Sequence, residues 1–276
     1  WEMKGRFPDI LNNPVSGETA RKLYDDAQEM LDTLIKEKWL TANGVIGFFP
    51  ASGVGDDIEV YTDETRTEVL ATLHNLRQQG EHRDGVPNKS QGDFIAPKDT
   101  GLADYVGAFA VTAGLGSGDK IAEFKAANDD YSAILLESLA DRLAEAFAER
   151  LHQRVRTEFW GYQPEEHLDN EALIAEKYTG IRPAPGYPSC PEHTEKATLF
   201  KLMDVTDRTG IELTESMAMW PGAAVSGWYF SHPQSQYFVV GRLAQDQVAD
   251  YAKRKGWTLA EAERWLAPNL GYNPED

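Results

Sequence analysis

One segment, residues 182–188, combines the residue types of a ligand-binding loop in the sequence RPAPGYP. Its three prolines hold the backbone extended and remove N–H donors, so the remaining main-chain groups stand at fixed positions. Arg182 offers a forked cation suited to a carboxylate, and Tyr187 adds a flat face and a hydroxyl. Gly186 lets a ligand approach the main chain closely. From residue types alone, a surface proline loop with a salt-bridged arginine is the favoured interpretation.

A glycine-rich run at residues 114–118 follows an apolar segment and invites comparison with nucleotide-binding loops. Such loops bring main-chain N–H groups against a phosphate or a nucleoside. A Rossmann-like site needs a second strand soon afterwards, because that strand carries the acid that holds the ribose. Here the next long segment has a helical pattern throughout. We therefore reject the motif and interpret the run as a flexible turn.

Another cluster, Cys190, Glu192 and His193, offers groups that bind metals or act as nucleophiles. Pro191 would strain a site built from three ligands so close together, and no fourth ligand lies nearby in the sequence. A cysteine with a neighbouring histidine is also a poor nucleophile unless a third group orients the histidine. We therefore assign no metal ligand and no catalytic side chain here, and expect a helix that begins with Thr194 as its cap.

The apolar periodicity predicts the elements that must position these residues. Helices are expected at 18–39, 119–156 (with a break near 129), 170–178, 195–209, 244–255 and 258–266. Strands are expected at 45–49, 57–61, 104–112, 213–230 and 237–240. Residues 66–79 fit a helix or a strand, and the polar segment 80–92, with its Gly and Pro, is typical of a loop. One α+β domain is the simplest interpretation.

The composition is that of a soluble globular protein. Of the 276 residues, 41% are hydrophobic and 26% are charged, which is ordinary for this class. The formal net charge of −18 argues against a nucleic-acid partner, since affinity for nucleic acids comes largely from neutralised phosphates. No apolar run approaches the roughly 20 residues that span a bilayer, and no signal peptide is recognised. The single cysteine excludes an internal disulfide, so a cytoplasmic location is expected.

Several segments of the sequence together resemble one known family. They read GDDIEVYTDETR (55–66), DYVGAFAVT (104–112), ADRLAEAFAERLHQRVR (140–156), RPAPGYPSCPEHTEK (182–196), LTESMAMWPGAAVSGWYFSHP (213–233) and ERWLAPNLGY (263–272). In this order they are similar to the C-terminal S-adenosylmethionine-binding reactivation, or activation, domain of cobalamin-dependent methionine synthase. The loop 80–92 and the turn 114–118 are the segments least expected to follow the family.

The resemblance implies one α+β domain over residues 1–276, with a mostly antiparallel sheet flanked by helices and no Rossmann-like fold. It also implies a function. In the family, cobalamin carries methyl groups from methyltetrahydrofolate to homocysteine in methionine biosynthesis, and occasional oxidation inactivates it as cob(II)alamin. The domain then supplies S-adenosylmethionine as methyl donor, while flavodoxin or an equivalent reductase supplies an electron. The implied partners are this reductase and the cobalamin-binding domain of the same parent polypeptide.

The resemblance further implies ligand contacts in the proline-rich segment. Arg182 would hold the methionine carboxylate of S-adenosylmethionine, and the main chain around it would contact the adenine. The contacting residues of this main-chain run would be Pro183, Ala184, Gly186 and Tyr187. The small residues Ala184 and Gly186 would leave room for the ligand.

Four more residues match positions that line the family's site. Glu145 and Glu176 match acids, whose carboxylates suit ribose hydroxyls or the α-ammonium group. Tyr237 matches a tyrosine of the family's site. Phe238 lies at the position of a second tyrosine, so a hydroxyl would be lost there, whereas stacking or main-chain contacts could still form. On residue types alone, both acids would be assigned to solvated helix faces.

Two expectations depend on the limits of the chain. It opens on Trp1 instead of Met, which suggests a fragment with a truncated N-terminal edge, and the family's site includes an aspartate just upstream of this position. Without cobalamin, the chain is expected to bind S-adenosylmethionine but not to turn it over, because its task is alignment and proximity and not proton transfer. The alternative function is a non-catalytic docking or sensing module that retains the fold.

Overall fold

The computed structural model describes residues 3–81, 83 and 85–274. Trp1, on which the expectation of a truncated edge rests, lies outside the described residues, as do positions 82 and 84 of the predicted loop. The described residues of that loop form neither a helix nor a strand until a 3-10 turn begins at Gln91.

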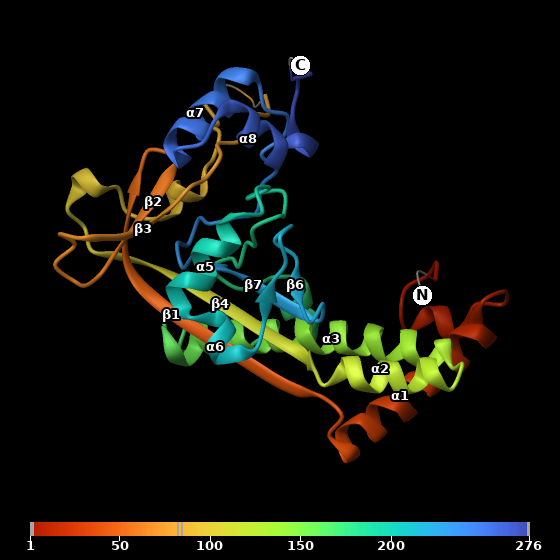
Figure 1. The fold of residues 1–276 in the computed structure, drawn as a ribbon. Coiled ribbons are helices and arrows are strands. Elements are labelled where there is room, and N and C mark those ends of the chain that lie inside the picture. The colour runs from red at the N-terminus through yellow and green to blue at the C-terminus, as the bar shows by residue number, and fades with distance from the viewer. Residues whose placement is uncertain (1–2, 82, 84, 275–276) are drawn as a thin grey trace.

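One antiparallel sheet forms the centre of the molecule (Figure 1). In the order β3-β2-β1-β4-β7, its strands are β3 (Val69–Leu73), β2 (Asp57–Tyr61), β1 (Thr41–Val54), β4 (Asp104–Leu115) and β7 (Ala224–Tyr229). The two long strands, β1 and β4, pair along most of their length. The ambiguous segment 66–79 contributes the edge strand β3. The predicted α+β fold with a mostly antiparallel sheet is confirmed.

One face of this sheet is covered by the long helix α3 (Asp130–Arg154). Successive side chains of a strand point to opposite faces, and those of Phe109 and Val111 in β4 pack with Ala148 and Leu151 of α3. The small Ala148 lets helix and sheet approach closely. The expected break before α3 is confirmed, because α2 ends before residue 127.

The opposite face is covered by α5 (Glu195–Met203), followed by α6 (Val205–Thr209). Leu199 of α5 is fully buried in the main core. Asp204 has a φ of 50°, in the left-handed region, and so ends α5. The single helix predicted over 195–209 is therefore wrong in detail, since one left-handed residue divides it into two.

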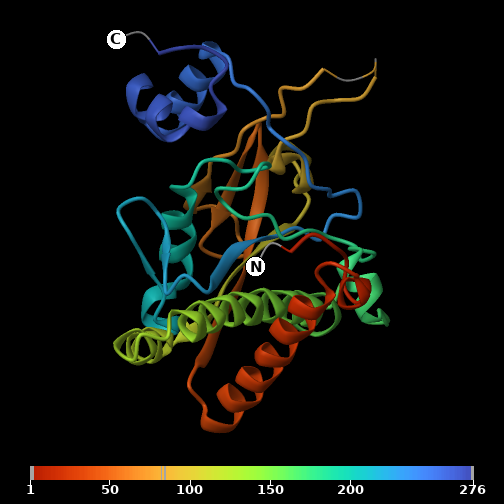
Figure 2. The ribbon, with the colours of Figure 1, turned by 90° about the vertical axis from the view of Figure 1, so that its right-hand side faces the viewer.

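The remaining helices lie at the two ends of the molecule (Figures 1 and 2). Near one end are α1 (Gly17–Glu37) and α2 (Ser117–Ala126), and at the other are α7 (Gln245–Lys255) and α8 (Leu259–Trp265). The smaller elements are α4 (Asn170–Ile174), β5 (Glu212–Leu213), β6 (Met219–Trp220), 3-10 turns at Asp9–Asn12, Gln91–Phe94, Lys98–Thr100 and Ala267–Asn269, and a π-helical turn at Val155–Phe159. No helix in the described part of the chain is both long and apolar enough to cross a membrane.

Two strand predictions need correction. The segment 213–230 contains three short strands, β5, β6 and β7, instead of one long one. The segment 237–240 is not a strand, although its apolar composition suggested one. It runs as an extended loop whose Val240 N–H donates to the Pro188 carbonyl at 2.9 Å. This loop therefore lies against the proline-rich segment and not in the sheet.

Candidate functional site

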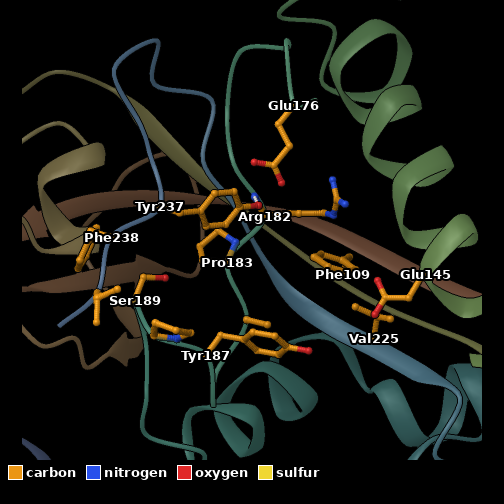
Figure 3. Close-up of a pocket in the computed structure, with 13 residues that line it drawn as sticks. Phe109, Glu145, Glu176, Arg182, Pro183, Tyr187, Ser189, Val225, Tyr237 and Phe238 are labelled. Atoms are coloured by element: carbon orange, nitrogen blue, oxygen red, sulfur yellow. Dashed lines mark hydrogen bonds between the residues drawn. The ribbon is translucent and has the colours of Figure 1, made fainter. Parts of the chain in front are cut away.

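A cavity of about 480 Å³ opens between α3, the sheet and the proline-rich segment (Figure 3). This volume suits a small organic ligand. Its lining combines apolar and charged side chains from six parts of the chain: Phe109, Glu145, Glu176, Arg182, Pro183, Ala184, Tyr187, Pro188, Ser189, Val225, Tyr237, Phe238 and Val239.

Eight of the nine residues expected to bind the ligand line this cavity, and Gly186 does not. Gly186 has a φ of +97°, and its N–H donates to the Cys190 carbonyl at 2.7 Å in a tight turn. A Cβ at this position would overlap the ring of His193. The glycine is thus required by its own backbone conformation and by its neighbour, which is a different reason from the room for a ligand expected from the sequence.

The proline-rich segment is held against the edge of the sheet. Ile181 forms an antiparallel bridge with Phe230, and the N–H of Trp228 donates to the Pro183 carbonyl at 2.9 Å. A Cβ at Gly227 of β7 would lie 2.5 Å from the same carbonyl oxygen. The absence of a side chain at Gly227 therefore lets the segment pass close over the strand, which places its main chain beside the cavity.

Arg182 is fixed at both its main chain and its side chain. Its N–H donates to the Tyr237 hydroxyl at 3.1 Å. Its guanidinium donates through Nη2 to Glu149 Oε2 at 2.7 Å, and through Nη1 to the Tyr178 hydroxyl at 2.7 Å and to His152 Nδ1 at 3.2 Å. Burial alone would lower the pKa of Arg182, but the interactions with Tyr178 and Glu149 raise it by more, so the pKa lies above its ordinary value. The guanidinium therefore stays charged at the wall of the cavity.

Two carboxylates reach the cavity from different elements (Figure 3). Glu145 projects from α3, and Glu176 follows α4 with a φ of 51°. Within the described residues, neither side chain forms a hydrogen bond or an ion pair. Because an ionised carboxylate only accepts hydrogen bonds, both remain available to hydroxyl or ammonium groups of a ligand.

Aromatic rings form the rest of the site. Phe109 stacks on Tyr229 with ring centroids 4.6 Å apart and forms part of the apolar wall. Phe238 is buried, and its ring lies 6.4 Å from that of Phe94. A phenylalanine suits this apolar environment, where a tyrosine hydroxyl would need a partner. Tyr187 is 62% exposed at the rim, so a flat face is available there.

Three side chains that contact Arg182 were not singled out from the sequence: Glu149, His152 and Tyr178. Glu149 lies four residues after Glu145, and His152 lies three residues after Glu149. These helical spacings place all three on one side of α3. His152 is fully buried. A polar residue within a buried helical stripe is unusual and is the signal that could have found it.

The Cys190 cluster is structural. Cys190 is buried, and burial raises the pKa of its thiol. Glu192 accepts hydrogen bonds from Lys255 at 2.7 Å and from the Thr194 hydroxyl at 2.6 Å. Thr194 stands at the N-cap position of α5, where the helix was expected to begin, but its side chain does not cap the helix. Its hydroxyl is engaged by Glu192 and Lys255 and bonds no N–H group of α5. Nowhere among the described residues do three His, Cys, Asp or Glu side chains form a metal-binding group.

The glycine-rich run forms the turn between β4 and α2. Gly116 has a φ of +90°, and a Cβ there would lie 2.6 Å from the Trp39 carbonyl oxygen. Ser117 donates its hydroxyl to the Gly114 carbonyl at 2.6 Å. The positive φ and the close approach to Trp39 explain Gly116 by local geometry, and the run forms a turn, as the sequence interpretation predicted.

Comparison with known proteins agrees with the geometry. A sequence model of the family described as "Vitamin B12 dependent methionine synthase, activation domain" matches residues 1–256. Among solved structures, a crystal structure of the MetH reactivation domain bound to AdoHcy is 59% identical to this chain, with a TM-score of 0.96. The match covers 99% of this chain and 84% of that one. This chain therefore belongs to the family of activation domains of vitamin B12-dependent methionine synthase.

Proposed function

We propose that the chain binds S-adenosylmethionine in the cavity beside Arg182. There it supplies a methyl group for reductive remethylation of cobalamin, which another domain of the parent methionine synthase would hold. The observation that carries the proposal is the convergence of Arg182, Glu145 and Glu176 on one cavity of suitable size. The similar structure contains AdoHcy, which is S-adenosylmethionine after loss of that methyl group.

The three charged groups suit the polar ends of this ligand. A guanidinium has five N–H groups, and Arg182 uses three of them in the contacts to Glu149, Tyr178 and His152. Two N–H groups remain, which is the number that a bidentate carboxylate accepts. The unpaired carboxylates of Glu145 and Glu176 are then available to the ribose hydroxyls or the α-ammonium group.

The adenine would lie along the main chain of Pro183 and Ala184. Both residues line the cavity, and Ala184 adds only a methyl group. Tyr187 and Tyr237 offer rings at the rim, where a base can stack.

The chemical task of this chain would be to align the methyl donor. The methyl group of a sulfonium is already activated, and reduced cobalamin, when present, supplies the nucleophile. Holding the two reactants in a productive geometry lowers the barrier without any proton transfer by the protein. We therefore expect the chain alone to bind S-adenosylmethionine and to methylate no homocysteine. The electron would come from flavodoxin or an equivalent reductase.

Replacement of the arginine tests the proposal. Arg182→Ala should weaken the binding of S-adenosylmethionine and of AdoHcy by about 1.5–3 kcal/mol, the range for hydrogen bonds to a charged group. Isothermal titration measures the effect, and Arg208→Ala in α6 is a matched control because Arg208 is exposed and lies outside the cavity lining. Equal affinity of Arg182→Ala and the wild type would reject the carboxylate assignment. A wild type without affinity for either ligand would favour the docking or sensing module.

A further inference from the structure

Three side chains behind the wall of the cavity hold the Arg182 guanidinium. Glu149, His152 and Tyr178 all contact it, and none of them lines the cavity. Two of them come from α3 and the third follows α4. The side chain of Arg182 extends toward α3 in Figure 3. Its position is therefore set by residues that a bound ligand would not need to touch.

Tyr178 contacts two cations, the partly buried Arg182 and the fully buried Arg156. Its hydroxyl accepts from Arg182, and the guanidinium of Arg156 lies 3.9 Å from the centre of its ring. Arg156 is fully buried and forms a double hydrogen bond with Glu166, in which the shortest contact is 2.8 Å. Because Arg156 is itself held by Glu166, the ring of Tyr178 has little freedom to move. The hydroxyl is thus a fixed acceptor for Arg182.

His152 fixes the same guanidinium from another side. Its ring stacks on Tyr229 at 5.0 Å and meets Tyr178 edge-on at 5.1 Å. A guanidinium can only donate hydrogen bonds, so the contact of Arg182 with His152 Nδ1 requires an unprotonated Nδ1. Burial, with Arg156 and Arg182 nearby, lowers the pKa of His152 well below its ordinary value. A neutral histidine is therefore the form that this site favours.

We propose that Glu149, His152 and Tyr178 are positioning residues for ligand recognition: together they hold the Arg182 guanidinium so that its two remaining N–H groups serve the amino-acid end of S-adenosylmethionine. The inference rests on the proposed function. A long side chain that is already immobilised loses less conformational entropy on binding. The three residues thus make the site selective for ligands that carry a carboxylate.

The variant Tyr178→Phe tests this role. It keeps the ring beneath Arg156 and removes only the oxygen that accepts from Arg182. Two ligands are titrated: AdoHcy, and 5′-methylthioadenosine, which has the adenosine part but no amino-acid end. We expect the Kd of AdoHcy to rise by up to about tenfold, because a less fixed Arg182 side chain loses more conformational entropy when the ligand binds. The Kd of 5′-methylthioadenosine should stay unchanged. Tyr272→Phe is the matched control, because Tyr272 also loses a hydrogen bond but lies outside the cavity lining.

A second variant, His152→Phe, keeps an aromatic ring against Tyr229 and removes the Nδ1 acceptor. It should show the same ligand selectivity, and circular dichroism of each sample checks the fold. Equal weakening of both ligands in the folded variants would reveal a merely structural role and overturn the inference. Unchanged affinity for AdoHcy in both variants would also overturn it. If the wild type bound neither ligand, the proposed function itself would fail, and this result is distinct because it appears before any substitution.

Discussion

Arg182 and Lys255 are two cations whose side chains are 17% and 8% exposed, and they lie at opposite ends of the segment that borders the cavity. They differ in how many of their N–H donors are used. The Lys255 ammonium donates to Glu192 at 2.7 Å, Thr194 at 2.6 Å and Glu195 at 2.8 Å. An ammonium has three N–H groups, so none remains. The Arg182 guanidinium has five and uses three. Unused donors, and not burial or charge alone, distinguish a group that is available to a ligand.

Lys255 and Arg182 also have different tasks along this stretch of chain. Lys255 of α7 ties down the start of α5 through Glu192 and Glu195, and thereby anchors the end of the proline-rich segment. Arg182 lies at the other end, where the cavity begins. A change at Lys255 should therefore affect stability, whereas a change at Arg182 or its partners should affect ligand affinity.

The largest effect is expected from Lys255→Met, which leaves two buried glutamates without their cation. Removal of one partner from a buried ion pair costs about 3–5 kcal/mol. Burial already raises the pKa of Glu195 against the attraction of Lys255, so the loss of the lysine makes its ionised form still less favourable. Urea denaturation should show the free energy of unfolding lowered by this amount.

Lys253→Met is the control for this prediction, because Lys253 lies in the same helix and is exposed. It should leave the free energy of unfolding nearly unchanged. Where the Lys255→Met protein remains folded, its affinity for AdoHcy should be close to that of the wild type. An equal loss of stability in both variants, or a loss of affinity without a loss of stability, would contradict the division of tasks between the two cations.

A smaller effect is expected from Gly186→Ala, in the turn between the two cations. The φ of +97° is unfavourable for alanine, and the added Cβ would overlap the His193 ring. Strain of this kind costs about 1–3 kcal/mol. Gly55→Ala is a matched control, since Gly55 has a φ of +61° with no atom within 4 Å of the added Cβ. If thermal unfolding shows the same loss of stability in both variants, the backbone conformation alone explains the loss. The contact of the new Cβ with His193 would then contribute nothing.

The sequence predicted those parts of the site that depend on local motifs. The proline-rich segment and the acids Glu145 and Glu176 could be found because their neighbours in the chain are distinctive. The contact between Arg182 and Glu149 could not be found, because Glu149 lies 33 residues away in sequence and is brought close only by the packing of α3 on the sheet. That contact is a property of the fold and leaves no local signature.

The same distinction explains the errors in the fold. Residues 237–240 have the composition of a strand, yet a strand needs a partner. The edge of β7 is already occupied by the proline-rich segment, whose Pro183 carbonyl accepts from Trp228. The break between α5 and α6 depends on the left-handed conformation of Asp204, which an aspartate adopts only in some contexts. Periodicity predicts the type of an element, whereas its ends depend on such single residues.

The smallest effect concerns His152, which has to remain neutral beside Arg182. Its pKa is lowered well below 6.5 by burial and by Arg156 and Arg182. Between that lowered pKa and 6.5, the unfolded chain binds a proton at this histidine and the folded protein does not. The free energy of unfolding therefore decreases as the pH falls through this range, with a slope of up to about 1.4 kcal/mol per pH unit, and the contribution vanishes above the unfolded pKa.

The measurement compares wild type and His152→Phe by urea denaturation between pH 7.5 and 5.5. Over this range the free energy of unfolding of the wild type should fall by about 1 kcal/mol more than that of the variant, which has no group that titrates at this position. Burial and Lys196 also lower the pKa of His193, but that residue is present in both proteins and its contribution cancels in the difference. Parallel curves for the two proteins would mean that His152 takes up a proton in the folded state. In that case its Nδ1 could not accept from Arg182, and the guanidinium would have one fewer fixed partner than Lys255.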